Sequence, residues 1–181
     1  RRPVRPRDIA VIARTRSALA ACERMLREAG IPAYADVDGG YFDALEVRIM
    51  LSLLELIENR RRDYPLLAVL RSPIGGLTST ELAQVRAARP EGSFRDAMIE
   101  YLPRGDETAA KLRALEEDLD RWRALSRALP LGEFVDLLLR ETGFYAYAGA
   151  MLGGAARQGN LDLLCAYASD IEAAQGGGLT G

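Results

Sequence analysis

The chain has 181 residues, 49% of them apolar, which is enough for a folded core and excludes a chain that is disordered throughout. Its formal net charge of −2 gives no overall attraction to nucleic acid, although residues 1–31 hold eight arginines against only three acidic residues. No apolar run is long enough to cross a membrane and the start of the chain lacks the apolar core of a signal peptide, so we expect a cytoplasmic protein.

The first part of the chain is predicted to form a strand, a helix and a second strand. Residues 8–13 are a short apolar run rich in branched side chains, typical of a buried strand. Apolar residues at helical spacing over residues 17–29 predict a helix that Gly30 ends, and residues 31–35 can form a second short strand. This order is typical of a βαβ piece of a parallel sheet. Because two strands do not make a stable sheet alone, they either pack on the helices that follow or complete a sheet outside this sequence.

The rest of the chain, after residue 37, has a helical pattern throughout. Asp43 and Glu46 have the spacing of a capping box that opens a helix, and Thr78 and Glu81 form the same pattern as T-x-x-E. The longest helix is predicted over residues 106–129, with an apolar seam close to heptad spacing. The sequence therefore predicts a mainly α fold, a bundle of about seven helices preceded by a small βαβ fragment.

Most residues that carry enzyme chemistry are missing. There is no histidine, which excludes imidazole bases, Ser-His-Asp triads and histidine metal sites. Two distant cysteines cannot form a zinc cluster, and no glycine-rich phosphate-binding loop precedes the single lysine, Lys111. Acidic residues 116–120 lie on the polar side of a helix, where carboxylates are usually solvated, and Asp36 with Asp38 is too sparse for Mg²⁺. We therefore expect no catalytic residue and no metal site, and a self-contained enzyme is disfavoured.

Two segments have the composition of anion-binding sites. Arg14, Thr15 and Arg16 follow the first predicted strand and flank a helix N-terminus, where backbone amides and the helix dipole favour phosphate. An ordinary solvated turn explains the same residues equally well.

The second segment is the glycine-rich turn over residues 71–78. Pro73 fixes the entry direction, while Gly75 and Gly76 tolerate positive φ and let another backbone approach closely. The helix that Thr78 opens points its N-terminal amides into the same space, as in hairpin modules that hold a nucleic-acid backbone, and Arg71 adds a charge beside it. A tight helix–helix connection is the alternative interpretation.

Taken in order, several segments resemble those of UvrD/Rep-type superfamily 1 DNA helicases, and most closely the AddA subunit of the AddAB helicase–nuclease. Each motif alone is weak, but their order and spacing together are specific, and they span nearly the whole chain. Besides the Arg-Thr pair at the first strand, they are Gly30-Ile31-Pro32, Gly39-Gly40 with Phe42, Glu46-Val47, residues 71–77 (RSPIGGL), and Arg157-Gln158 with Asn160, Leu161, Asp162 and Leu164.

The resemblance implies a domain division and a parent protein. Residues 1–38 would be a fragment of the second RecA-like motor domain, residues 39–175 the helical accessory domain called 2B, and residues 176–181 a linker back to the motor. The fragment would need no cofactor of its own, whereas the parent would bind ATP and Mg²⁺. That parent would be a DNA helicase, with exonuclease activity, that processes double-strand ends in recombinational repair.

The resemblance also implies site residues and partners. DNA, as single strand and duplex end, and an AddB-like subunit would be the partners. The alternative is a helical protein-interaction module that docks on a partner subunit without touching DNA. An open basic surface around Arg71 favours DNA, and apolar patches on the long helix favour a protein partner. The implied residues are Arg14, Thr15 and Arg16 for single-stranded DNA, and Arg71, Pro73, Gly75, Gly76 and Thr78 for duplex DNA.

Overall fold

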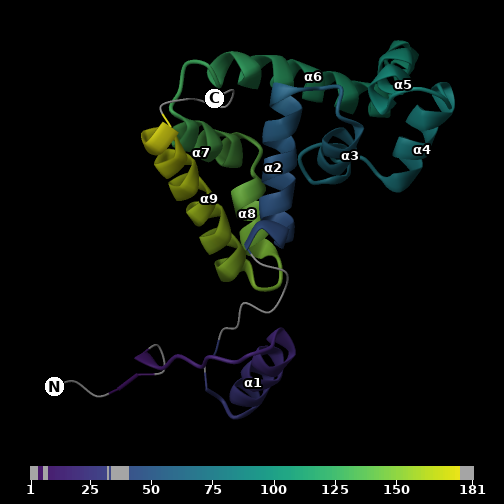
Figure 1. Ribbon diagram of the computed structural model, residues 1–181. Coiled ribbons are helices and arrows are strands. Elements are labelled where there is room, and N and C mark those ends of the chain that lie inside the picture. Colours follow the sequence, from purple (N-terminus) through teal and green to yellow (C-terminus); the bar gives the residue numbers. More distant parts are fainter. Residues whose placement is uncertain (1–3, 6–7, 32, 34–40, 176–181) are drawn as a thin grey trace. The chain divides into compact units, whose positions relative to one another are not determined.

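The computed structural model describes residues 4–5, 8–31, 33 and 41–175 (Figure 1). It divides into two compact units, Arg1–Ala44 and Leu45–Gly181. The domain boundary predicted at residues 38 and 39 lies outside the described residues, so the assignment of the two parts to a motor and an accessory domain stays a prediction.

The first unit contains helix α1 (Arg16–Glu28), which begins one residue before the predicted start. Two residues after the helix, Gly30, with a φ of +73°, lets the Ile31 amide turn back to the Leu26 carbonyl at 2.9 Å, which terminates the helix as predicted. The short 3₁₀ turn η2 (Tyr41–Asp43) closes the described part of this unit.

The predicted βαβ fragment is not seen. Residues 8–13 contain no strand, and their apolar side chains are exposed, Ile12 at 95%. Residues 31 and 33 are not in a strand either, and the rest of the second predicted strand lies outside the described residues. The expectation was wrong because a strand needs a neighbour to complete its hydrogen bonds, and the described residues supply none.

The second unit is entirely helical in its described residues, which confirms the mainly α prediction. Its first helix, α2, is central, and Val47, Met50, Leu53, Leu56 and Ile57 on it are all fully buried. It packs on α3, α6 and α9 (Figure 1), while α4 pairs with α5, and α7 and α8 pack on α9. The helices are α2 (Leu45–Glu58), α3 (Asp63–Arg71), α4 (Ser79–Ala88), α5 (Phe94–Tyr101), η3 (Leu102–Arg104), α6 (Glu107–Leu125), α7 (Leu131–Glu141), α8 (Phe144–Ala150) and α9 (Gly154–Gln175).

Helix α6 has the predicted apolar seam, with Leu112, Leu115, Leu119 and Trp122 buried. It ends at Leu125, before the predicted end at residue 129, and at 19 residues it is shorter than α9 at 22 residues. Its polar side binds other helices. Glu116 accepts hydrogen bonds from Arg60, just after α2, at 3.1 Å and from Arg95 on α5 at 2.7 Å. The acidic residues 116–120 were predicted to be solvated, but one of them, Glu116, links α6 to the end of α2 and to α5.

Candidate nucleic-acid interface

The glycine-rich turn folds back onto the end of α3. The Ser72 hydroxyl donates to the Val69 carbonyl at 2.7 Å and accepts the Ile74 amide at 3.2 Å. The next amides also bond within the turn: Gly75 donates to the Val69 carbonyl, Gly76 to the Ser72 carbonyl and Leu77 to the Leu70 carbonyl, at 3.2, 2.8 and 2.9 Å. With Ser72 and Leu77 buried, these bonds fix the shape of the turn.

The two glycines are required for different reasons. A Cβ at Gly75 would lie 2.5 Å from the Leu70 Cα and 2.8 Å from the Leu70 carbonyl oxygen, so there is no room for a side chain. At Gly76 there is open space, but φ is +64°, in the left-handed region that glycine adopts without strain. The glycines were predicted to let another backbone approach closely. The backbone that approaches Gly75 is that of α3 in the same chain.

Thr78 caps α4 as predicted, through a complete capping box with Glu81. The Thr78 hydroxyl accepts the Glu81 amide at 3.2 Å, and one Glu81 carboxylate oxygen accepts the Thr78 amide at 2.6 Å. The other Glu81 oxygen binds Lys111 at 2.8 Å and Thr108 at 3.2 Å on α6. The bond from Lys111, with those from Thr78 and Thr108, lowers the pKa of Glu81 to about 2, so it is a carboxylate at neutral pH.

The capped turn offers fewer donors than the sequence suggested. The backbone amides of Gly75, Gly76, Leu77, Thr78 and Glu81 all donate within the chain. The Glu81 carboxylate also sits against the α4 N-terminus, where an external anion would have to bind. The expected grip by free amides is therefore wrong for these five groups, and the exposed side chains of the turn become the stronger candidates for attracting a polyanion.

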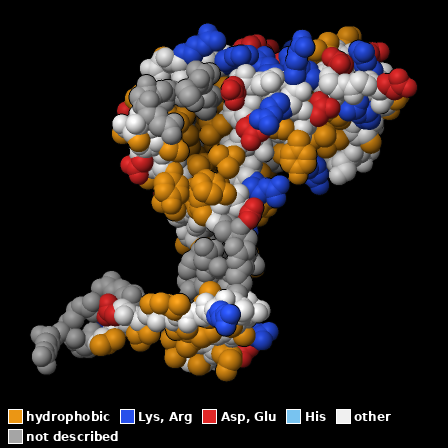
Figure 2. Space-filling model, in the orientation of Figure 1, with side chains coloured by type: hydrophobic (Ala, Val, Ile, Leu, Met, Phe, Trp, Pro, Cys, Tyr) orange, Lys and Arg blue, Asp and Glu red, His pale blue; other side chains and the backbone are white. Residues whose placement is uncertain are grey.

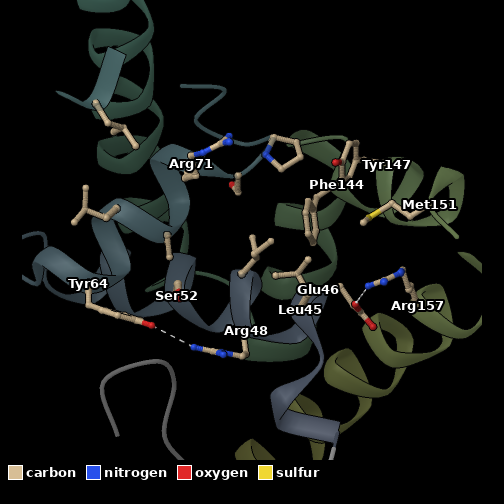
Figure 3. A pocket seen from close by; sticks show the side chains of 16 residues that line it. Leu45, Glu46, Arg48, Ser52, Tyr64, Arg71, Phe144, Tyr147, Met151 and Arg157 are labelled. Carbon is tan, nitrogen blue, oxygen red and sulfur yellow. Dashed lines mark hydrogen bonds and ion pairs between the residues drawn. The ribbon is translucent and has the colours of Figure 1, made fainter. Parts of the chain in front are cut away.

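Arg71, at the end of α3, is the side chain suited to that role. It is exposed and forms no ion pair with the residues that the structure describes. Arg71, Ser72 and Pro73 line one side of a groove of about 680 Å³, whose other walls come from α2, α4, α8 and the start of α9 (Figure 3). The remaining lining residues are Leu45, Glu46, Arg48, Ile49, Ser52, Tyr64, Leu67, Ala68, Leu82, Phe144, Tyr147, Met151 and Arg157.

The groove has a positive charge. Its one acidic lining residue, Glu46, is 3% exposed and binds Arg157 Nη1 at 2.5 Å and Asn160 Nδ2 at 2.7 Å. Arg157 therefore neutralises Glu46. Among the described residues, Arg48 meets only the Tyr64 hydroxyl, at 3.4 Å, and Arg71 has no acidic partner (Figure 3).

The structure joins two motifs that the sequence left separate. Glu46, noted with Val47, and Asn160, noted with Arg157, meet across 114 positions of sequence. Glu46 is consequently not the partner of a capping box with Asp43, because α2 begins only at Leu45 and both carboxylate oxygens bind the start of α9. Arg48, Tyr64 and Tyr147 were missed altogether, since no local pattern marks residues that meet only when three helices pack.

The other predicted segment, Arg14 to Arg16, lies in the first unit. Arg14 is exposed and makes no ion pair within the described part of the chain. Thr15 caps α1, with its hydroxyl accepting the Ala18 amide at 3.4 Å. Arg16 is the first residue of α1, and its side chain lies outside what the structure describes. A helix N-terminus therefore lies beside Arg14, one residue before the predicted start, and the phosphate contact stays a prediction.

Surface composition bears on the choice between DNA and a protein partner. In the view of Figure 2, basic and acidic side chains alternate over α5 and α6, and hydrophobic side chains gather over α7 and α9. No large apolar side chain of α6 is among the exposed ones, whereas Leu163, Tyr167 and Ile171 on α9 are 40%, 40% and 50% exposed. The described residues contain no helix that could span a membrane and no cluster of three potential metal ligands.

This architecture, a helical domain with an arginine-flanked groove, has close relatives in sequence. No family model matches the chain. It is 42% identical over 168 residues to the AddA-type ATP-dependent helicase/nuclease subunit of Anoxybacillus flavithermus, covering 92% of this chain and 14% of the relative. The subunits of the same name from Alkaliphilus metalliredigens and Heliobacterium modesticaldum are each 43% identical, over 92% and 95% of this chain.

These matches confirm the resemblance to AddA-type subunits of the UvrD/Rep-type helicases. They extend over nearly the whole chain, from the arginine-rich start to the last helix. The chain spans only about 14% of the length of these curated relatives.

Proposed function

We propose that this chain is a non-catalytic DNA-binding and regulatory segment of an ATP-dependent helicase–nuclease subunit. The parent unwinds and processes double-strand DNA ends in recombinational repair, in the bacterial cytoplasm and together with an AddB-like subunit. Residues 1–38 belong to its second motor domain, residues 39–175 to its accessory domain and residues 176–181 to the linker between them. ATP and Mg²⁺ are bound by other parts of the parent. The similarity to subunits named as helicase/nucleases supports this assignment.

The accessory domain takes no part in ATP hydrolysis and contributes by positioning duplex DNA at the turn of residues 71–78. Arg71 is the observation that carries this proposal, because it is an exposed guanidinium without an acidic partner among the described residues, on a turn whose shape is fixed by its own hydrogen bonds. A turn of fixed shape places that side chain with little backbone ordering cost when a phosphate binds. Pro73, Gly75, Gly76 and Thr78 set the surface that meets the duplex, while the motor, fuelled by ATP, moves the strand.

Arg14, Thr15 and Arg16 are assigned to single-stranded DNA. Arg14 is exposed and unpaired within the described part of the chain, and Thr15 holds the start of α1, so a phosphate can approach the arginine side chain beside a helix N-terminus.

A titration of the 181-residue chain with a blunt duplex, at about 50 and 200 mM salt, tests the duplex contact. Arg71→Ala should weaken binding and lower the slope of log affinity against log salt by about 0.9, the value for one phosphate contact. Arg123→Ala is the matched control, because Arg123 is also exposed on a helix but lies outside the groove. Equal affinities and slopes for the two variants would refute the role of Arg71.

The second candidate function is docking on a partner subunit without DNA contact. The apolar stripe of Leu163, Tyr167 and Ile171 on α9 favours it, since these residues lie on successive turns and are exposed. Helix α6, the long helix first considered for this role, is a poor candidate because its apolar seam is buried inside the domain. Loss of subunit association on Ile171→Asp, with duplex affinity unchanged, would identify the stripe as a protein interface.

A further inference from the structure

The groove carries an aromatic stack that reaches the surface. Phe144 and Tyr147 on α8 are stacked, with ring centroids 6.1 Å apart and an interplanar angle of 19°. Phe144 is 2% exposed, whereas Tyr147 is 46% exposed. The inner ring is therefore enclosed by the domain, whereas the outer ring is about half exposed and lines the groove. Another flat ring laid against Tyr147 would continue the stack.

A second aromatic ring lies on α3. Tyr64 is 74% exposed, and its hydroxyl accepts a long hydrogen bond of 3.4 Å from Arg48 on α2. Figure 3 shows the Tyr64–Arg48 pair, with Ser52 beside it, on one side of the view and Tyr147 on the other. Two exposed rings thus flank one depression.

The charges of the groove select an anionic occupant. Arg48, Arg71 and Arg157 line it, and Glu46, the only acidic residue among its described lining residues, is neutralised by Arg157. The guanidinium groups of Arg48 and Arg71 have no acidic partner among the described residues, so a bound anion would supply the missing negative charge. The volume of about 680 Å³ lies within the range in which proteins bind small organic ligands.

We propose that this groove binds a short stretch of unpaired nucleic acid, with bases stacked on Tyr147 and Tyr64 and phosphates held by Arg48 and Arg71. Exposed aromatic rings beside unpaired arginines are the means by which proteins hold single strands, because every base has a face that can stack. An extended acidic peptide fits less well, since the groove walls are helices and a turn, without the sheet edge on which extended peptides usually pair.

This site goes beyond the proposed duplex contact, and Arg71 is the one charged residue that the two share. If both are present, the accessory domain touches paired and unpaired DNA side by side, as at a fork. The groove does not require the first unit, because all its lining residues lie in the unit Leu45–Gly181.

The experiment is a fluorescence-anisotropy titration of the 181-residue chain with a labelled oligothymidylate of about twelve nucleotides. Tyr64→Ala and Tyr147→Leu should each weaken binding by roughly five- to a hundred-fold, which corresponds to the loss of one stacked base. Tyr64→Phe keeps the ring and should bind as the wild type does. Arg48→Ala should lower the slope of log affinity against log salt by about 0.7, the value for one phosphate of a single strand.

Two matched variants outside the groove serve as controls. Tyr167→Ala removes a tyrosine of similar exposure on α9, and Arg123→Ala removes an exposed arginine on α6. Both should leave the affinity for the oligonucleotide within about twofold. Circular dichroism of each variant checks the fold, and because Tyr64 is so exposed, Tyr64→Ala should leave the domain folded.

The inference is overturned if Tyr64→Ala and Tyr147→Leu bind the oligonucleotide as tightly as the controls do. It is also overturned if a glutamate- and phenylalanine-rich peptide binds in a Tyr64-dependent way while the oligonucleotide does not. Duplex titrations of the same variants keep this result separate from the proposed function. If the unaltered chain fails to bind the duplex but binds the oligonucleotide in a tyrosine-dependent way, only the contact at the turn is refuted.

Discussion

The ion pair between Glu46 and Arg157 joins α2 to α9, and its loss from one side should destabilise the second unit, which Arg157→Ala tests. Removal of Arg157 leaves a carboxylate that is 3% exposed with only the Asn160 bond of 2.7 Å. Breaking a buried pair from one side costs about 3–5 kcal/mol. Because Arg157 is 27% exposed and Asn160 remains, we expect the lower end, about 3 kcal/mol.

Urea unfolding followed by circular dichroism measures this loss, which should also lower the melting temperature by about 10 °C in a unit of this size. Arg140→Ala is the matched control, since Arg140 pairs with Asp136 on one exposed face of α7 and should contribute less than about 0.5 kcal/mol. Adding Glu46→Gln to Arg157→Ala removes the stranded charge and should restore part of the stability. A loss as small as that of Arg140→Ala, with no rescue by Glu46→Gln, would show that the pair does not hold α2 to α9.

The remaining predictions concern the glycine-rich turn and its cap. Gly75→Ala should destabilise the unit by about 2–3 kcal/mol, because its Cβ would meet the α3 backbone at 2.5 Å, while Gly76→Ala should cost about 1 kcal/mol for positive φ. The reverse order in a urea titration would contradict the close approach at Gly75. The folded-state pKa of Glu81, about 2, lies below its ordinary value of 4.5, so the stability it contributes is complete above pH 4.5 and is lost as the pH falls towards 2. Glu81→Gln should therefore lower stability at neutral pH and flatten the acid side of the stability profile, and a profile with the wild-type slope would count against this assignment.

The sequence predicted some elements well because the signals lie within a few residues. The capping box at Thr78, the buried seam of α6 and the stop at Gly30 each depend on local spacing, and each is present. The strand at residues 8–13 was wrong because the apolar run that predicts a strand gives no information about a neighbour to pair with. Glu46 was misassigned for a related reason. Its spacing from Asp43 indicates a local capping box, whereas in the structure its carboxylate binds Arg157 and Asn160, more than a hundred positions away.

By itself, the amino-acid sequence determined the mainly helical class, the positions of the turn and its cap, and the resemblance to AddA-type subunits that the relatives confirm. Only the tertiary structure decided what the turn does with its amides and where the free charges lie. The amides of Gly75 and Gly76 are used by α3 and the turn itself, which leaves the exposed Arg71 as the proposed contact for a polyanion. The groove beside it joins α2, α3 and α8, so Tyr64 and Tyr147 share a site only after packing. A local pattern specifies a helix and its ends, whereas a binding surface depends on which helices are neighbours in space.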